Sequence, residues 1–195
     1  MVSLIEFDIK LFLYLNSFHS DFWDIVMVYI SAKATWIPLY LTVLFFFVKK
    51  FGIKNALILL LFFLTLIALS DQISGIFKHQ FLRLRPCFEP KISTIVHCLK
   101  KPGGEYGFVS AHAANAFAFA TFSALIFKTK IYTICIILWA AIVAYSRIYL
   151  GLHYPGDVIC GAISGIIIAY LLNMILLKIN NKYKILYKPI NSTLK

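Results

Sequence analysis

The chain has 195 residues, of which 61% are hydrophobic and 14% are charged, and its mean hydropathy is +0.84. This composition excludes an ordinary soluble globular domain, in which charged residues alone make up about 25%. The formal net charge of +11 is compatible with binding to nucleic acid or to anionic lipid, and the positions of the lysines decide between these partners.

The first predicted element is a helix within residues 1–20 that lies in the membrane interface. The segment places its apolar residues on one helical face and its acidic residues, Glu6 and Asp8, elsewhere. The apolar face consists of Ile5, Ile9, Phe12 and Leu13. Since the segment lacks the basic start and small-residue cleavage site of a signal peptide, we expect it to be retained.

Five apolar runs follow, each near the length of a membrane span, which needs roughly 20 residues. They cover about Phe22–Val48, Ala56–Phe77, Ala111–Phe127, Ile131–Tyr145 and Val158–Leu177. Lys33 interrupts the first run and could split it into a short inserted helix followed by a span, which gives six segments. The predicted fold is all-α: an integral membrane helical bundle of five to six transmembrane helices with an N-terminal interfacial helix, in a single domain over residues 1–195.

The lysines gather at the ends of these spans. In the five-span arrangement, ten of them lie on one side of the membrane: Lys49, Lys50, Lys54, Lys128, Lys130, Lys178, Lys182, Lys184, Lys188 and Lys195. Because positive loop residues mark the cytoplasmic side, residues 178–195 are predicted to form a basic cytoplasmic tail. The charge therefore indicates topology, and we expect no nucleic-acid partner.

The opposite side carries the loop Arg85–Val109, which contains Cys87 and Cys98. If this loop faces an oxidising compartment, the two cysteines are expected to form a disulfide that adds about 2–3 kcal/mol of stability. Cys135 and Cys160 fall within spans and are predicted to be buried as small apolar residues.

Ionisable residues on this outer side come from three separate stretches. "KHQFLRLRP" ends the second span, "GFVSAHAANAF" opens the third, and "SRIYLGLHYPGD" joins the fourth to the fifth. The five-span topology brings all three to one membrane face. The guanidinium forks of Arg85 and Arg147, with the point charge of Lys78, suit the oxygens of a phosphate. Ser110 stands where a helix begins, a position that also favours an anion.

The histidines of these stretches suggest phosphoryl transfer. Pro155 suits the first turn of a helix, so Asp157 is placed where its carboxylate reaches one nitrogen of His153. This contact fixes the tautomer and makes the other nitrogen a better nucleophile or base. His112 is then free to act as the acid that protonates a leaving oxygen.

Residues 78–157 resemble the three-part signature of the type 2 phosphatidic acid phosphatase superfamily, which also includes the vanadium haloperoxidases. The matching residues are Lys78, Arg85, Pro86, Ser110, His112, Ser146, Arg147, His153 and Asp157. The resemblance implies a helical bundle that hydrolyses a phosphomonoester or pyrophosphate without a metal ion or other cofactor. The resemblance also implies that His153 attacks phosphorus to form a phosphohistidine, with Asp157 supporting it and His112 protonating the leaving group. The residues implied to hold the phosphate oxygens are Lys78, Arg85, Ser110 and Arg147.

Three further positions have open interpretations. Arg83 is either a second contact to the lipid headgroup or a snorkelling surface arginine. Ala111 stands where the family usually has glycine, so it keeps an N–H donor for substrate but adds a methyl group. Asp71 lies within an apolar span, and we expect it to have a partner such as Lys78 or Arg147.

We expect a small bacterial membrane lipid phosphatase whose partners are the bilayer and a phosphorylated lipid, with undecaprenyl pyrophosphate favoured. Lipid A phosphate, phosphatidylglycerol phosphate and phosphatidic acid are the alternatives. The site is expected on the extracytoplasmic, periplasmic face of the cytoplasmic membrane, and the oligomeric state stays open. An anion transporter and a lipid-binding protein are non-enzymatic alternatives. Clustering of the charges at one face argues against the transporter, and the intact catalytic side chains argue against simple lipid binding.

Overall fold

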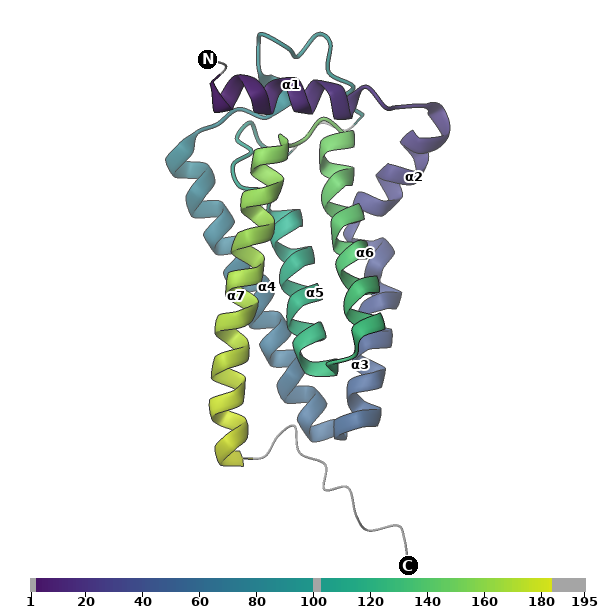
Figure 1. The fold of residues 1–195 in the computed structure, drawn as a ribbon, viewed down its shortest axis with the longest axis vertical. Helices are drawn as coiled ribbons and strands as arrows, with labels where there is room; N and C mark the ends of the chain where they lie inside the picture. The colour runs from purple at the N-terminus through teal and green to yellow at the C-terminus, as the bar shows by residue number, and fades with distance from the viewer. Residues whose placement is uncertain (1–2, 100–102, 184–195) are drawn as a thin grey trace, which may run out of the picture.

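The computed structural model describes residues 3–99 and 103–183, and these residues are almost entirely helical (Figure 1). In chain order the helices are α1 (Leu4–Asn16), α2 (Asp21–Ser31), α3 (Ile37–Phe51), α4 (Ile53–Phe81), α5 (Ala111–Phe127), α6 (Lys130–Tyr149) and α7 (Pro155–Tyr183), with short 3₁₀ helices at Lys33–Trp36 and Pro86–Phe88. The β-type pairing within the described ranges consists of an isolated bridge between Leu84 and Tyr106. The all-α prediction is confirmed.

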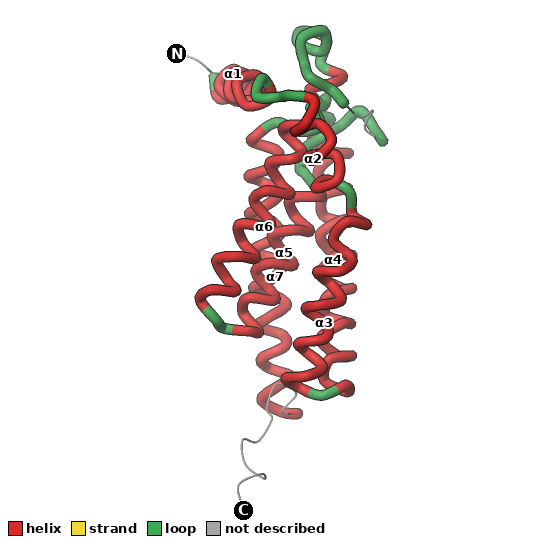
Figure 2. Tube along the Cα trace, turned by 90° about the vertical axis from the view of Figure 1, so that its right-hand side faces the viewer, coloured by secondary structure: helices red, strands yellow, loops and turns green. Residues whose placement is uncertain are grey.

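Helices α3 to α7 run along the long axis, whereas α1 lies across one end of the bundle (Figures 1 and 2). The segments long and apolar enough to cross a membrane are Lys33–Phe51, Ile53–Phe81, Lys130–Tyr149 and Pro155–Asn181, and Ala111–Phe127 is a shorter apolar helix beside them. The chain is therefore a multi-pass membrane protein with an N-terminal helix set across the bundle, as the sequence predicts.

The first predicted span is divided, so the reading with a short helix before the span is the correct one. Helix α2 ends at Ser31, and α3 begins at Ile37 with a proline in its first turn, a position that needs no N–H donor. Side chains of the connecting segment bond to the last turn of α2. Thr35 Oγ1 donates to Tyr29 O across 2.7 Å, and Trp36 Nε1 donates to Ile30 O across 2.7 Å.

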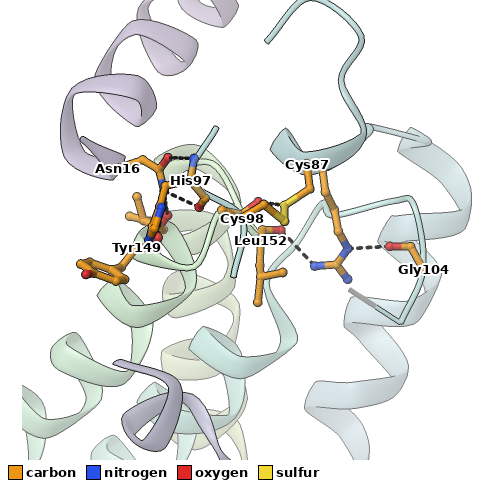
Figure 3. Close-up of a disulfide and its surroundings, with 10 residues drawn as sticks. Asn16, Cys87, His97, Cys98, Gly104, Tyr149 and Leu152 are labelled. Carbon is orange, nitrogen blue, oxygen red and sulfur yellow. Dashed lines mark hydrogen bonds between the residues drawn. A yellow bond between two sulfur atoms is a disulfide. The ribbon is translucent and has the colours of Figure 1, made fainter. Parts of the chain in front are cut away.

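Helix α1 is fixed to the bundle by one apolar and one polar side chain. Phe12 is fully buried, and its ring meets that of Tyr154 edge-on at 5.3 Å. Asn16 donates from Nδ2 to Tyr149 O across 2.8 Å and accepts at Oδ1 from His97 N across 2.9 Å (Figure 3). These bonds attach α1 both to the end of α6 and to the loop after α4.

Helices α5 and α7 pack with their backbones in contact at the α1 end. A Cβ atom on Gly161 would lie 2.5 Å from Ser110 O, and one on Gly165 would lie 2.1 Å from Ala114 O, so only glycine permits this approach. The contact sets Ser110 beside the start of α7, where Ser110 N donates to Asp157 O across 3.0 Å.

The α3–α4 turn, the α5–α6 turn and the end of α7 lie at the end of the bundle opposite α1 (Figure 1). These turns carry the lysines that the sequence assigns to one side, and Lys50 Nζ lies 3.4 Å from Phe127 O across the two turns. Most of the predicted basic tail, residues 184–195, lies outside the described residues.

Candidate active site

The three ionisable stretches converge at the α1 end of the bundle. Lys78 lies near the end of α4, Arg85 in the loop that follows, and Arg147 in the last turn of α6. All three positive charges act on His153, which lies between α6 and α7. The topology predicted from the sequence therefore brings these residues into one site.

His153 is almost completely buried; its Nε2 is hydrogen-bonded, whereas its Nδ1 has no hydrogen-bond partner among the described residues. Its Nε2 lies 2.7 Å from Nη1 of Arg85, and its Nδ1 lies 3.5 Å from Oδ2 of Asp157. A guanidinium only donates, so Nε2 must be the acceptor and the proton is assigned to Nδ1, on the side of Asp157. Burial, with the charge of Arg85, lowers the pKa of His153 well below 6.5. The imidazole is therefore neutral at neutral pH.

The turn between α6 and α7 places these groups. Leu152 N donates to Arg147 O across 3.0 Å, and Gly151 takes a φ of +73°, a backbone conformation that L side chains rarely adopt. Helix α7 begins at Pro155, as predicted, and Asp157 accepts from Tyr154 N across 3.1 Å. The chain reversal therefore turns His153 and Asp157 toward each other.

Arg85 is held mainly by backbone carbonyls. It donates from Nε to Gly104 O across 2.8 Å and from Nη1 to Leu152 O across 3.0 Å. Gly107 completes this wall, because a Cβ atom there would lie 3.1 Å from Arg85 Cγ and 3.2 Å from Asp157 Oδ2. The sequence analysis missed Gly107, and its place in a long loop gave no signal for it.

Ser110 and His112 bring the start of α5 to the site. Ser110 is fully buried and caps α5, accepting at Oγ from Ala113 N across 3.4 Å, while Ala111 is the first residue of the helix. His112 is partly buried, the charges of Arg147, Lys33 and Lys78 act on it, and it also interacts with His153. The two histidines thus belong to the same cluster at the same end of the bundle.

Arg147 has an unused donor. Its Nη1 donates to Ser31 Oγ, and Ser31, in α2, is another residue that the sequence analysis missed. The Nε of Arg147 is buried and has no hydrogen-bond partner among the described residues. An unpaired buried donor is costly, and an anion in the site would satisfy it.

Two of the open positions find partners that the sequence analysis did not name. Arg83 forms ion pairs with Asp8 at 2.7 Å and Asp157 at 2.8 Å, so it is not a free surface side chain, and its contact to a lipid headgroup stays a prediction. The hydrogen-bond partner of Asp71 is Asn115, at 2.8 Å, whereas the expected partner Lys78 interacts with Asp71 through its charge.

Cys87 and Cys98 are joined by a disulfide in the loop above the site (Figure 3). The bond fixes the chain just after Arg85, and Cys87 Sγ lies 2.9 Å from Gly151 O in the α6–α7 turn. The prediction that Cys135 and Cys160 are buried is wrong, since Cys135 is exposed on the bundle surface and Cys160 is partly exposed. Apolar residues in a span need no burial within the protein when lipid surrounds it.

Two adjoining cavities extend from the site into the bundle. One, of about 130 Å³, is lined by His112, Asn115 and Lys33 and by the aromatic side chains of Trp36 and Trp139. The other, of about 220 Å³, is apolar and lies between α3, α4 and α5. The residues that line both are Tyr40, Ile67 and Phe119. An apolar path therefore leads from His112 toward the membrane interior.

Comparisons with known proteins agree with this arrangement. The model of the PAP2 superfamily matches residues 59–180. A lipid A 4'-phosphatase from Bacteroides thetaiotaomicron is 39% identical over 165 residues, which cover 83% of this chain and 73% of the relative. An undecaprenyl-diphosphatase from Sulfolobus acidocaldarius is 29% identical over 171 residues, 86% of this chain and 77% of the relative.

The fold has a solved counterpart in the crystal structure of Aquifex aeolicus LpxE. The two structures superpose with a TM-score of 0.67 at 25% sequence identity, covering 85% of this chain and 94% of that one. Because the family model covers more than half of the chain and a relative of 39% identity spans most of its length, this chain belongs to the PAP2 superfamily.

Proposed function

We propose that this membrane hydrolase removes a phosphate group from lipid A or a closely similar phosphoglycolipid, through a phosphohistidine formed on His153. The observation that carries the reaction is the grouping of His153, Asp157 and His112 with three cations at one end of the bundle. The substrate class is supported by the 39% identity to a lipid A 4'-phosphatase.

The reaction uses His153 Nε2 as the nucleophile. Arg85 leaves that nitrogen and turns its N–H groups to the phosphate oxygens, so that the lone pair faces phosphorus. As the N–P bond forms, the bond between phosphorus and the sugar oxygen breaks, and His112 protonates this departing oxygen. Asp157 stabilises the positive charge that develops on the imidazole. Water then attacks the phosphohistidine and gives a proton to His112, and the N–P bond breaks, so that inorganic phosphate leaves and both histidines are restored.

The anion is held by donors that are already in place. Arg147 offers its unpaired Nε, Lys78 adds a charge at the end of α4, and the first turn of α5 offers the N–H groups of Ala111 and its neighbours. Within the described ranges, no group of three or more His, Cys, Asp or Glu side chains is arranged to hold a metal ion. As the family resemblance implies, we propose hydrolysis without a metal or other cofactor, with the cations of the protein itself holding the anion.

The cavities support a substrate with an apolar tail. They begin beside His112 and continue between α3 and α4, so an acyl chain fits there while the headgroup enters the cationic cluster. The lysine-rich turns lie at the end of the bundle opposite the site. Because positive loops mark the cytoplasmic side, this supports an active site on the periplasmic face of the cytoplasmic membrane.

Undecaprenyl pyrophosphate, the substrate that the sequence analysis favoured, is the second candidate. The 29% identity to an undecaprenyl-diphosphatase supports it, but the relatives fit the alternative, lipid A phosphate, better. Both lipids present a terminal phosphate at the edge of the bilayer, so the site chemistry alone does not separate them.

A side-by-side assay tests the proposal. Purified protein in detergent with EDTA is given lipid A carrying only the 1-phosphate or only the 4'-phosphate, and undecaprenyl pyrophosphate, with His153→Ala as the control. We expect phosphate release from one lipid A species and none from the variant. Faster release from undecaprenyl pyrophosphate overturns the substrate assignment, and release that depends on a divalent metal overturns the mechanism.

A further inference from the structure

Arg83 joins two carboxylates that come from opposite ends of the chain. Its Nη1 donates to Oδ1 of Asp157 across 2.8 Å, and its Nη2 donates to Oδ2 of Asp8 across 2.7 Å. The guanidinium also lies 4.1 Å from the ring centroid of Tyr154. Arg83 is therefore held by Asp157, Asp8 and the ring of Tyr154, and it contacts the carboxylate that pairs with His153.

Asp8 is itself tied to the start of α7. Its Oδ1 accepts from Gly156 N across 2.8 Å, and a Cβ atom on Gly156 would lie 2.8 Å from Asp8 Oδ2, so the glycine leaves room for the carboxylate. The interfacial helix α1 thus contacts the residue next to Asp157 through one side chain, in addition to the bonds of Asn16 at its other end.

The charges of Asp157, Arg83 and Asp8 do not cancel. Asp157 is fully buried and needs a counter-ion, which Arg83 supplies. With Arg83 alone the pair would be neutral, and little negative charge would remain to stabilise a positive imidazole on His153. The carboxylate of Asp8 shares Arg83, so that the three groups together carry one negative charge beside His153.

We propose that Asp8 and Arg83 are positioning residues for the phosphoryl transfer, which makes the interfacial helix α1 part of the catalytic apparatus. This inference rests on the proposed function. Arg83 holds the carboxylate of Asp157 toward His153 Nδ1, and Asp8 sets how strongly Arg83 draws the negative charge of Asp157 away from the histidine.

Charged and titratable groups reach the His153–Asp157 pair from every adjoining element. They are Lys78 of α4, Arg83 and Arg85 of the following loop, His112 of α5, Arg147 of α6, Tyr154 of the turn before α7, and Asp8 of α1 through Arg83. Among them, removal of Asp8 or Arg83 leaves the groups assigned to the phosphate untouched. Their effect on the reaction is therefore separable from loss of substrate binding.

Two substitutions have opposite expected effects on the pH–rate profile. Arg83→Gln removes the cation beside Asp157, so Asp157 accepts a proton more easily and the acid limb moves to higher pH. Asp8→Asn leaves Arg83 wholly to Asp157, so the acid limb moves to lower pH. Both variants are expected to lower kcat by about tenfold or more with little change in KM, because neither residue is among those assigned to hold the phosphate.

The experiment measures kcat and KM from about pH 4 to about pH 8 for the wild type, the two variants, the double variant and Arg83→Lys. Glu6→Gln is the matched control, since Glu6 is an exposed residue of the same helix whose side chain accepts from Ser3 N across 3.2 Å. We expect Glu6→Gln to keep the wild-type profile, the double variant to match Arg83→Gln, and Arg83→Lys to recover part of kcat.

The outcomes separate this inference from the proposed function. If the wild type releases no phosphate from any lipid substrate, the proposed function fails. If the wild type is active but the two variants move the acid limb in the same direction or not at all, the positioning role is wrong. Should either single variant fail to fold, the shift in the other and the partial recovery by Arg83→Lys decide the question in the same way.

Discussion

Nη1 of Arg85 donates a hydrogen bond across 2.7 Å to Nε2 of His153, the atom that the proposed mechanism uses as the nucleophile. The same guanidinium is anchored at Gly104 O and Leu152 O. It therefore needs only a small displacement to exchange the imidazole for a phosphate oxygen. We therefore propose two roles for Arg85, protecting the nucleophile in the free enzyme and binding the anion in the complex.

The first prediction concerns this exchange. Arg85→Lys keeps the charge but loses the planar fork, so we expect kcat/KM for the lipid phosphate to fall by about 10- to 100-fold. Phosphate release measured over a range of substrate concentrations gives this ratio. Lys91→Ala, an exposed cation of the same loop, is the control and is expected to stay near wild type. Equal activity of Arg85→Lys and wild type would show that the fork is not used.

Local patterns predicted much of this site. The spacing of His153 and Asp157 around Pro155 gave the start of α7 and the orientation of the carboxylate, and Ser110 was correctly placed at the start of α5. These features depend on neighbours within a few residues. The possible split of the first span at Lys33 was visible for the same reason, since a charged residue interrupts the apolar run there.

The long-range polar partners were not predictable. Asp8 and Arg83 are separated by 75 residues and Ser31 and Arg147 by 116, and a single polar residue in a helix carries no sign of its partner. Asp71 illustrates the difficulty, because charge alone favoured a cation, whereas the packing of α4 on α5 supplies the amide of Asn115. Pairing of this kind follows from tertiary packing and not from periodicity.

The second prediction concerns pH. Burial and the charge of Arg85 lower the pKa of His153 well below 6.5, so the activity should stay level as the pH falls through 6.5 and decline only at clearly lower pH. In the unfolded chain the histidine binds its proton first, so its contribution to stability is lost as the pH falls below about 6.5. Rates of phosphohistidine formation and melting temperatures in detergent, wild type against His153→Gln, check both effects. A rate that halves near pH 6.5 would contradict a buried neutral His153.

The third prediction tests the apolar path. Ile67 lines both cavities, so Ile67→Trp should obstruct the acyl chain. We expect activity on a long-chain lipid to fall by about tenfold or more, which corresponds to about 1.36 kcal/mol or more in activation free energy. Hydrolysis of a small water-soluble phosphate ester should change little, because the cationic cluster is intact. Leu57→Trp, a lipid-facing position of the same helix, is the control. Unchanged hydrolysis of the long-chain lipid would show that its acyl chain does not lie in these cavities.

The fourth prediction concerns the disulfide. Cys87 and Cys98 are 11 residues apart, and a loop of this size is expected to contribute about 2–3 kcal/mol. The double substitution Cys87→Ser with Cys98→Ser should therefore lower the melting temperature, and reducing agent should do the same to the wild type. Cys135→Ser serves as the control, because Cys135 is a free cysteine. A melting temperature that is insensitive to reduction would show that the bridge does not stabilise the loop.

The fifth prediction concerns the glycines that allow α7 to meet α5. A methyl group on Gly165 would lie 2.1 Å from the carbonyl oxygen of Ala114, so Gly165→Ala forces the two backbones apart. Overpacking of this kind costs about 1–3 kcal/mol. The displacement also moves Asp157 away from Ser110, so activity should fall together with the melting temperature.

Gly75→Ala separates packing from helix propensity, because nothing lies within 4 Å of a Cβ atom at Gly75. This substitution should leave activity unchanged and raise stability by up to about 1 kcal/mol, since alanine favours helix over glycine. A Gly165→Ala variant that is as stable and as active as Gly75→Ala would mean that α5 and α7 do not pack closely. The joint position of Ser110 and Asp157 would then need a different cause.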